Sequence, residues 1–143
     1  MKVMIDTNIM ISAVLFPRGK ASLALKKALL PPFQAVICDY VLKEFMGKFD
    51  EKFPEAKADM EAFLDDFLPA TIIAITPTRE IEGEVRIRDQ KDRPILRAAL
   101  AAKVDLLLTG DKDFLEAEVV EPRIISVAEF LGVKVKEKKL TSR

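Results

Sequence analysis

Two acidic residues follow apolar runs that have the length and composition of buried strands. Asp6 ends the run at residues 2–5, and Asp111 comes shortly after the run at 105–109. In an open parallel sheet, ligands bind beyond the carboxyl ends of the strands, at the point where the strand order reverses. If the order reverses between these two strands, both carboxylates stand over the same crevice.

Two further acids are expected at the same edge. Asp92 begins the helical pattern that leads into the 105–109 run, and Glu44 lies in the first turns of the helix after residues 34–37. Each acid also fits a plainer role, because Asp92 is a good N-cap and Glu44 can be a solvated helix residue. Asp89 is interpreted as a loop acid.

Clustered carboxylates repel one another, and burial increases the repulsion. Hard divalent cations relieve it, since Mg²⁺ prefers oxygen ligands and keeps several waters. Two such ions about 3.5–4 Å apart form the usual clamp for phosphodiester hydrolysis. The four acids therefore predict a Mg²⁺ or Mn²⁺ site with hydrolytic chemistry.

Composition excludes most other catalytic groups. The 143 residues include no histidine and a single cysteine, Cys38, which rules out Ser-His-Asp and Cys-His chemistry, His-ligated metals and an internal disulfide. A reducing, cytoplasmic setting fits this cysteine usage. The apolar run at 9–16 is too short to span a bilayer, so no membrane association is expected.

Charge is balanced overall, with 23 basic and 23 acidic residues, but it is not uniform along the chain. Residues 134–143 hold five basic residues against Glu137, while the preceding residues carry a compensating acidic excess. We therefore predict a domain over residues 1–131 followed by a basic tail over 132–143. Such a tail is interpreted as a solvated chain end, with a ligand-binding arm as the alternative.

Strand-like and helix-like segments alternate along the chain, which favours βαβ units and a parallel sheet. Thr7 or Asn8 is expected to cap the segment after the first strand, and Asp39 to cap the helix after the second. Ser126 and Glu129 form a predicted capping box. The result is an α/β fold, a three-layer α/β/α sandwich with strands over 2–5, 34–37, 71–75, 105–109 and 123–126, and helices over 21–30, about 39–49, 54–68, 92–103 and from 126.

The motifs around these acids resemble the PIN-domain nucleases, in the branch described as toxins of type II toxin–antitoxin pairs. The resemblance covers residues 1 to about 131. Its most specific piece is VDLLLTGDKDF at 104–114, and it also includes Asp6-Thr7-Asn8, VLKEF at 41–45 and DRPIL at 92–96.

This resemblance implies a PIN-like five-stranded parallel sheet in the order 3-2-1-4-5, which places strands one and four side by side. It implies that the protein is a divalent-metal-dependent endoribonuclease that cuts RNA, often as a homodimer. It also implies that an antitoxin protein holds this enzyme inactive. The residues that match the family's acidic, metal-binding quartet are Asp6, Glu44, Asp92 and Asp111, with Asp113 as an accessory acid and Thr7, Asn8 and Thr109 as orienting polar residues.

Basic residues near these motifs are candidate contacts for RNA phosphates. Two follow the first strand and its apolar run, and the others lie near Asp92 and Asp111. They are Arg18, Lys20, Arg86, Arg88, Arg93 and Lys112.

Two alternatives remain open. One is a catalytically inactive PIN-fold interaction module, although such a module has no physical reason to keep four clustered charges. The other is an aspartyl phosphatase or phosphotransferase, for which the haloacid-dehalogenase-like pattern requires Asp-x-Asp where this chain has Asp6-Thr7-Asn8. A receiver domain would need an acid after the third strand, and residues 71–78 have none.

Overall fold

A five-stranded, all-parallel sheet forms the centre of the protein, in a computed structural model that describes residues 1–134. The strand order is β3-β2-β1-β4-β5, which confirms the expected fold class and order. The strands are β1 (Lys2–Ile5), β2 (Gln34–Cys38), β3 (Ile72–Ala74), β4 (Leu106–Leu108) and β5 (Arg123–Ile125).

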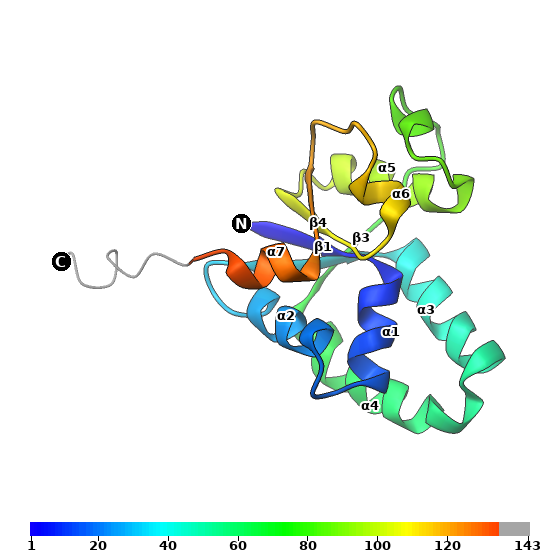
Figure 1. The fold of residues 1–143 in the computed structure, drawn as a ribbon. Coiled ribbons are helices and arrows are strands. Elements are labelled where there is room, and N and C mark those ends of the chain that lie inside the picture. Colours follow the sequence, from blue (N-terminus) through cyan, green and yellow to red (C-terminus); the bar gives the residue numbers. More distant parts are fainter. Residues whose placement is uncertain (135–143) are drawn as a thin grey trace.

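Helices cover both faces of this sheet, and Figure 1 shows α5 and α6 on one side, with α1, α2, α4 and α7 on the other. The helix bounds are α1 (Thr7–Leu15), α2 (Lys20–Ala28), α3 (Asp39–Lys52), α4 (Lys57–Phe67), α5 (Arg93–Ala101), α6 (Lys112–Leu115) and α7 (Val127–Gly132). Short 3-10 turns occupy Pro54–Ala56, Leu68–Ala70, Glu84–Arg86 and Gln90–Asp92. Among the helices of residues 1–134, none is long and apolar enough to cross a bilayer.

Several local predictions need correction. Pro54 opens a 3-10 turn that precedes α4 and does not begin the α-helix itself. Asp39 is the first residue of α3 and Cys38 occupies the cap position, while the Asp39 carboxylate accepts hydrogen bonds from Thr76. The one-turn helix α6 was not anticipated. It forms because Oδ1 of Asp111 accepts a hydrogen bond from the backbone N–H of Asp113.

The two central strands are fully enclosed, as expected for a parallel sheet with helices on both faces. Met4 and Ile5 of β1 and Leu107 and Leu108 of β4 have no exposed surface. Ile5 pairs in register with Leu108. The residues that follow these two strands are therefore neighbours at the carboxyl edge of the sheet.

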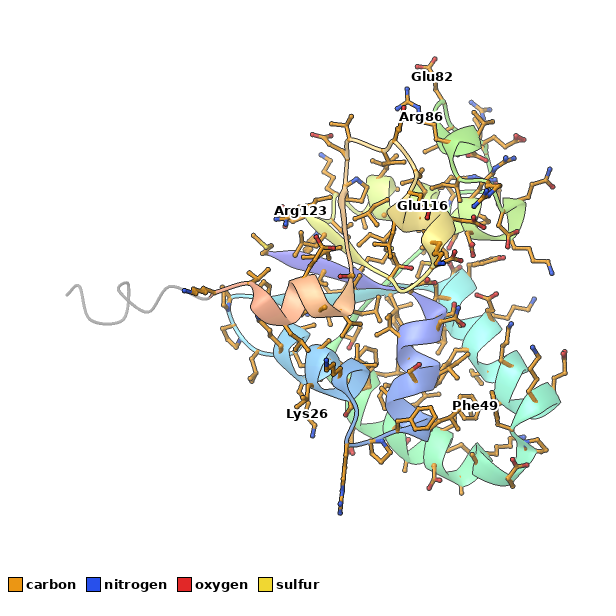
Figure 2. All side chains as sticks on the ribbon, viewed as in Figure 1. Lys26, Phe49, Glu82, Arg86, Glu116 and Arg123 are labelled. Atoms are coloured by element: carbon orange, nitrogen blue, oxygen red, sulfur yellow. The ribbon has the colours of Figure 1, made fainter. Side chains whose placement is uncertain are left out.

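A group of phenylalanines holds α3 against α4. Phe45 and Phe49 are fully buried, with ring centroids 5.1 Å apart in an edge-to-face arrangement, and Phe63 lies 5.8 Å from Phe45. Phe49 points from α3 toward the interior of the helical layer in Figure 2. This packing fixes the rotation of α3, and hence the direction in which its polar face, including Glu44, points.

The last described helix is tied to α2. The predicted capping box is confirmed at the start of α7, with Ser126 and Glu129 bonding reciprocally. Lys27 donates hydrogen bonds to the carbonyls of Phe130, Leu131 and Val133 at the end of α7, and the Phe130 carbonyl also accepts from the Val133 N–H. The predicted boundary at residue 131 falls in this helix, and most of the predicted basic tail, residues 135–143, lies outside the described residues.

Candidate active site

Asp6 is a buried carboxylate at the carboxyl end of the central strand, with only 3 % of its surface exposed. Oδ1 accepts from the backbone N–H of Thr7 at 2.7 Å, and Oδ2 accepts from the Thr109 hydroxyl at 2.7 Å. Asp6 itself occupies the N-cap position of α1, so the expectation that Thr7 or Asn8 caps this helix is wrong. Burial raises the pKa of Asp6 to about 6. The two hydrogen bonds oppose this shift, and the nearby Asp111 and Glu44 charges add to it.

Thr7 connects Asp6 to the helix that carries Glu44. Its hydroxyl donates to Oε1 of Glu44 at 2.5 Å, across 37 residues of sequence. Thr7 is 2 % exposed and Glu44 is half-buried. The first turn of α1 therefore orients one oxygen of Glu44 toward the end of β1.

Asp111 is linked to Asp6 through Thr109. The Thr109 hydroxyl donates to Asp6 and accepts from the backbone N–H of Asp111 at 3.0 Å. Asp111 also caps α6, since its Oδ1 accepts from the Asp113 N–H at 2.8 Å. The hydroxyl oxygen of Thr109 therefore sets the relative positions of Asp6 and Asp111, which follow β1 and β4.

Asp92 completes the group without acting as the expected helix cap. It stands at the N-cap position of α5, but its carboxylate makes no capping bond within the described chain. Asp89, one turn earlier, accepts from the Lys91 N–H at 3.0 Å. The pKa of Asp92 is raised to about 8, first by burial, then by the close approach of the Asp111 carboxyl and by the charge of Asp6. Its Oδ2 is buried and has no hydrogen-bond partner among residues 1–134.

Asp92 also lies beside a second pair of acids. One carboxylate oxygen from each of Asp89, Asp92 and Asp113 falls within 4.8 Å of the others. The distances therefore group Asp92 with Asp89 and Asp113, and its pKa is raised by Asp6 and Asp111 as well as by Asp89. These two groups are compatible, because Asp92 stands between them and belongs to both.

The arrangement fits a hard divalent cation. All the charged donors are carboxylate oxygens, the type that Mg²⁺ and Mn²⁺ bind. An orphaned buried oxygen on Asp92 and the raised pKa values of Asp6 and Asp92 indicate that the ionised forms of these acids lack a counterion. Buried polar groups in native proteins are nearly always satisfied, and a cation at this position would satisfy this one.

Arg88 neutralises one member of the group. Its Nε and Nη2 donate to Oδ1 of Asp113 at 2.8 and 2.6 Å, although the Arg88 side chain is 75 % exposed. Arg86 donates to the Glu118 carbonyl at 3.0 Å, and both arginines line a pocket of about 240 Å³ with Asp113 and Glu116. Figure 2 shows Arg86 and Glu116 on the side of the sheet that α5 and α6 cover.

The other basic candidates differ in position. Arg93 is half-buried and donates to the Ile87 carbonyl at 2.9 Å, so it supports the loop, while Lys112 is exposed on α6. Arg18 and Lys20 were expected near the end of the first strand. They follow α1 at its far end from Asp6, and Lys20 lines a pocket with Gly110, the residue before Asp111. Asn8 is exposed in the first turn of α1.

Sequence reasoning missed two features beside the acids. Tyr40 donates its hydroxyl to the Lys91 carbonyl at 2.5 Å, linking α3 to the turn that holds Asp92. The buried Glu84 pairs with Arg97 of α5 and anchors the loop before that turn. Only Tyr40 left a signal in the sequence, because it lies four residues before Glu44 and so shares its helix face.

Comparison with known proteins agrees with the fold described above. A family model described as "PIN domain" matches residues 2–113. Among solved structures, VapBC2 from Rickettsia felis bound to a promoter DNA fragment has a TM-score of 0.66 at 17 % identity, covering 88 % of this chain and 98 % of the matched one.

Two further structures have the same fold. DNA-bound VapBC from Salmonella typhimurium gives a TM-score of 0.64 at 16 % identity, covering 89 % of this chain and 98 % of that one. FitAcB from Neisseria gonorrhoeae gives 0.63 at 17 % identity, with coverages of 88 % and 98 %. No curated protein matches the chain.

Proposed function

Because this chain belongs to the PIN domain family, we propose that it is a divalent-metal-dependent endoribonuclease that hydrolyses RNA phosphodiester bonds. The observation that carries the proposal is the convergence of Asp6, Asp92 and Asp111, with one oxygen of Asp92 buried and unpartnered within residues 1–134. Glu44 joins them through Thr7. A purely structural cluster of this kind would only lower the stability of the fold, because its carboxylates repel one another.

Asp6, Glu44, Asp92 and Asp111 would hold Mg²⁺ or Mn²⁺. When bound, the cation supplies an activated water and neutralises the charge that develops on the leaving oxygen. Thr109 and Thr7 orient the carboxylates by holding one oxygen of Asp6 and one of Glu44. Arg88 and Lys112, both exposed beside the acids, provide positive charge for the RNA backbone.

The partners follow from the motif resemblance to toxins and from the likeness to chains of VapBC and FitAcB. We expect an antitoxin protein that binds this chain and blocks the acidic site, and a homodimer as the assembled state. The single cysteine, Cys38, is buried and free, which suits the reducing cytoplasm.

The proposal is tested by incubating the protein with labelled single-stranded RNA and DNA of the same sequence, in chelator, Mg²⁺ or Mn²⁺. We expect cleavage of RNA only when the cation is present. Asp6→Asn should abolish it, while Asp65→Asn, which alters an exposed acid on α4, should not. Cleavage of DNA alone would contradict the assigned substrate. Cleavage of neither would favour the inactive interaction module.

A further inference from the structure

A pocket of about 480 Å³ lies beside the acidic group, on the side of α3, and has no role in the function proposed above. Its volume falls within the usual range for small-molecule sites. The walls come from the start of α3, the segment after β3 and the start of α5. The residues that matter here are Asp39, Tyr40, Lys43, Thr76, Thr78 and Pro94.

Tyr40 joins this pocket to the acids. It lies one helical turn before Glu44, on the same face of α3. Its hydroxyl donates to the carbonyl of Lys91, which stands between Asp89 and Asp92 in the chain. Burial raises the pKa of Tyr40, and the charges of Glu44 and Asp92 raise it further, as expected for a side chain that lies close to both acids.

The pocket is held in a fixed shape. Oδ1 of Asp39 accepts from the N–H of Thr76 at 2.8 Å and from its hydroxyl at 2.5 Å. This tie joins the segment after β3 to the start of α3. The half-buried ring of Tyr40 is pinned at its hydroxyl end by the Lys91 carbonyl. A fixed aromatic ring loses little conformational entropy when a ligand packs on it.

Three chemical groups in this pocket match the parts of a nucleotide. The ring of Tyr40 offers a stacking surface for an unpaired base. Asp39 and the Thr76 and Thr78 hydroxyls offer acceptors for donors on the edge of a base. Lys43 is exposed and forms no salt bridge with any residue of the described chain, so its charge is available to a phosphate.

We propose that this pocket binds the nucleotide next to the scissile phosphate of single-stranded RNA, with its base stacked on Tyr40 and its phosphate beside Lys43. The inference rests on the proposed function and adds a recognition subsite to it. Paired bases cannot reach the ring, so the subsite selects single-stranded substrates.

The chain contains one tyrosine and no tryptophan, which makes a direct test available. In protein labelled with 3-fluorotyrosine, the single ¹⁹F resonance reports on Tyr40 alone. The probe is a six-residue oligoadenylate RNA, added in chelator and again in Ca²⁺. The matched control is a ribose-phosphate oligomer of the same length without bases. We expect a saturable shift with the oligoadenylate and none with the abasic oligomer.

Binding measured by fluorescence anisotropy separates the two contacts. Tyr40→Leu should weaken binding of the oligoadenylate by about tenfold and leave the abasic oligomer unaffected. Tyr40→Phe keeps the ring and should retain most of the affinity. Lys43→Met should weaken binding of both oligomers.

The outcomes distinguish this subsite from the proposed activity. Oligoadenylate binding without a ¹⁹F shift, an equal shift from the abasic oligomer, or no binding in either condition would overturn the subsite. If the wild type also cleaves RNA in Mn²⁺, the nuclease proposal stands without it. A base-dependent shift in a protein that cleaves no RNA would support the subsite and remove the nuclease.

Discussion

The hydroxyl of Thr109 donates a 2.7 Å hydrogen bond to Oδ2 of Asp6, although 103 residues separate them in the chain. Both side chains are buried, at the carboxyl ends of the adjacent strands β4 and β1. The same hydroxyl accepts from the N–H of Asp111. The strand order that places β1 beside β4 therefore determines how two of the four acids face each other.

Thr109→Val should disturb this contact without changing the volume of the side chain. The pKa of Asp6 should rise further, because the hydrogen bond that lowers it is lost. The free energy of unfolding should fall by about 1–3 kcal/mol, and cleavage of RNA should weaken. Urea unfolding and the cleavage assay check both effects. Thr109→Ser, which keeps the hydroxyl, is the control, and an equal loss in both variants would show that packing and not the hydrogen bond matters.

The pH dependence of stability in chelator follows from the raised pKa of Asp6. This pKa is about 6 in the folded protein against 3.8 as the ordinary value, so the folded state holds its proton more strongly. The resulting stabilisation is complete below about pH 4 and is lost as the pH rises through 6. Asp92, whose pKa is about 8, extends the same trend upward.

Asp6→Asn should remove the part of this trend that comes from Asp6. Relative to wild type, the variant should gain stability as the pH rises from 4 to 7, by up to about 3 kcal/mol for a shift from 3.8 to about 6. Urea unfolding of both proteins at several pH values, in chelator, measures the difference. A difference that stays constant or shrinks with pH would mean that Asp6 is not a strained carboxylate.

The sequence was most informative where an acidic residue follows the end of a predicted strand. Asp6 and Asp111 could be placed at one edge because short apolar runs precede them, and parallel strands share a carboxyl edge. The strand order came only from the family resemblance, since pairing between distant segments leaves little trace in a single sequence. The position of Asp92 was predicted, but its missing capping bond was not, because that depends on the neighbouring Asp89 and Asp111.

The contacts that hold the site were the least predictable. Arg88 is a predicted phosphate contact, and the contact of its guanidinium with Asp113, 25 residues away, was not predicted. α1 begins directly after Asp6, so Arg18 and Lys20 lie beyond its far end, and the pocket that Lys20 shares with Gly110 was not predicted. Each case depends on the path of a loop or helix, which short-range patterns do not determine.

The buried pair of Glu84 and Arg97 should be essential for the loop that leads to Asp92. The Arg97 guanidinium donates to both Glu84 oxygens, at 2.8 and 2.9 Å. The Glu84 side chain is 3 % exposed and the Arg97 side chain is 14 % exposed. Arg97→Met leaves a buried, unpaired carboxylate and should lower the free energy of unfolding by about 3–5 kcal/mol. Hydrogen exchange should also become faster over residues 84–92.

A matched control is the exposed pair of Lys57 and Asp50, whose side chains are 53 % and 61 % exposed. Lys57→Met should cost less than about 1 kcal/mol. Chemical denaturation of both variants provides the comparison. Equal losses, or unchanged exchange over residues 84–92 in Arg97→Met, would be inconsistent with a structural role for the buried pair.

Metal binding by the four acids is tested most directly by melting temperature, measured in chelator and in rising concentrations of Mn²⁺. The wild type is compared with a variant that combines Asp6→Asn, Glu44→Gln, Asp92→Asn and Asp111→Asn. In chelator the variant should melt higher, because its charges no longer repel. With Mn²⁺ only the wild type should gain stability, by about 2.7 kcal/mol at 100 times the dissociation constant. Equal shifts in both proteins would show that the cation binds elsewhere and that these acids do not form the metal site.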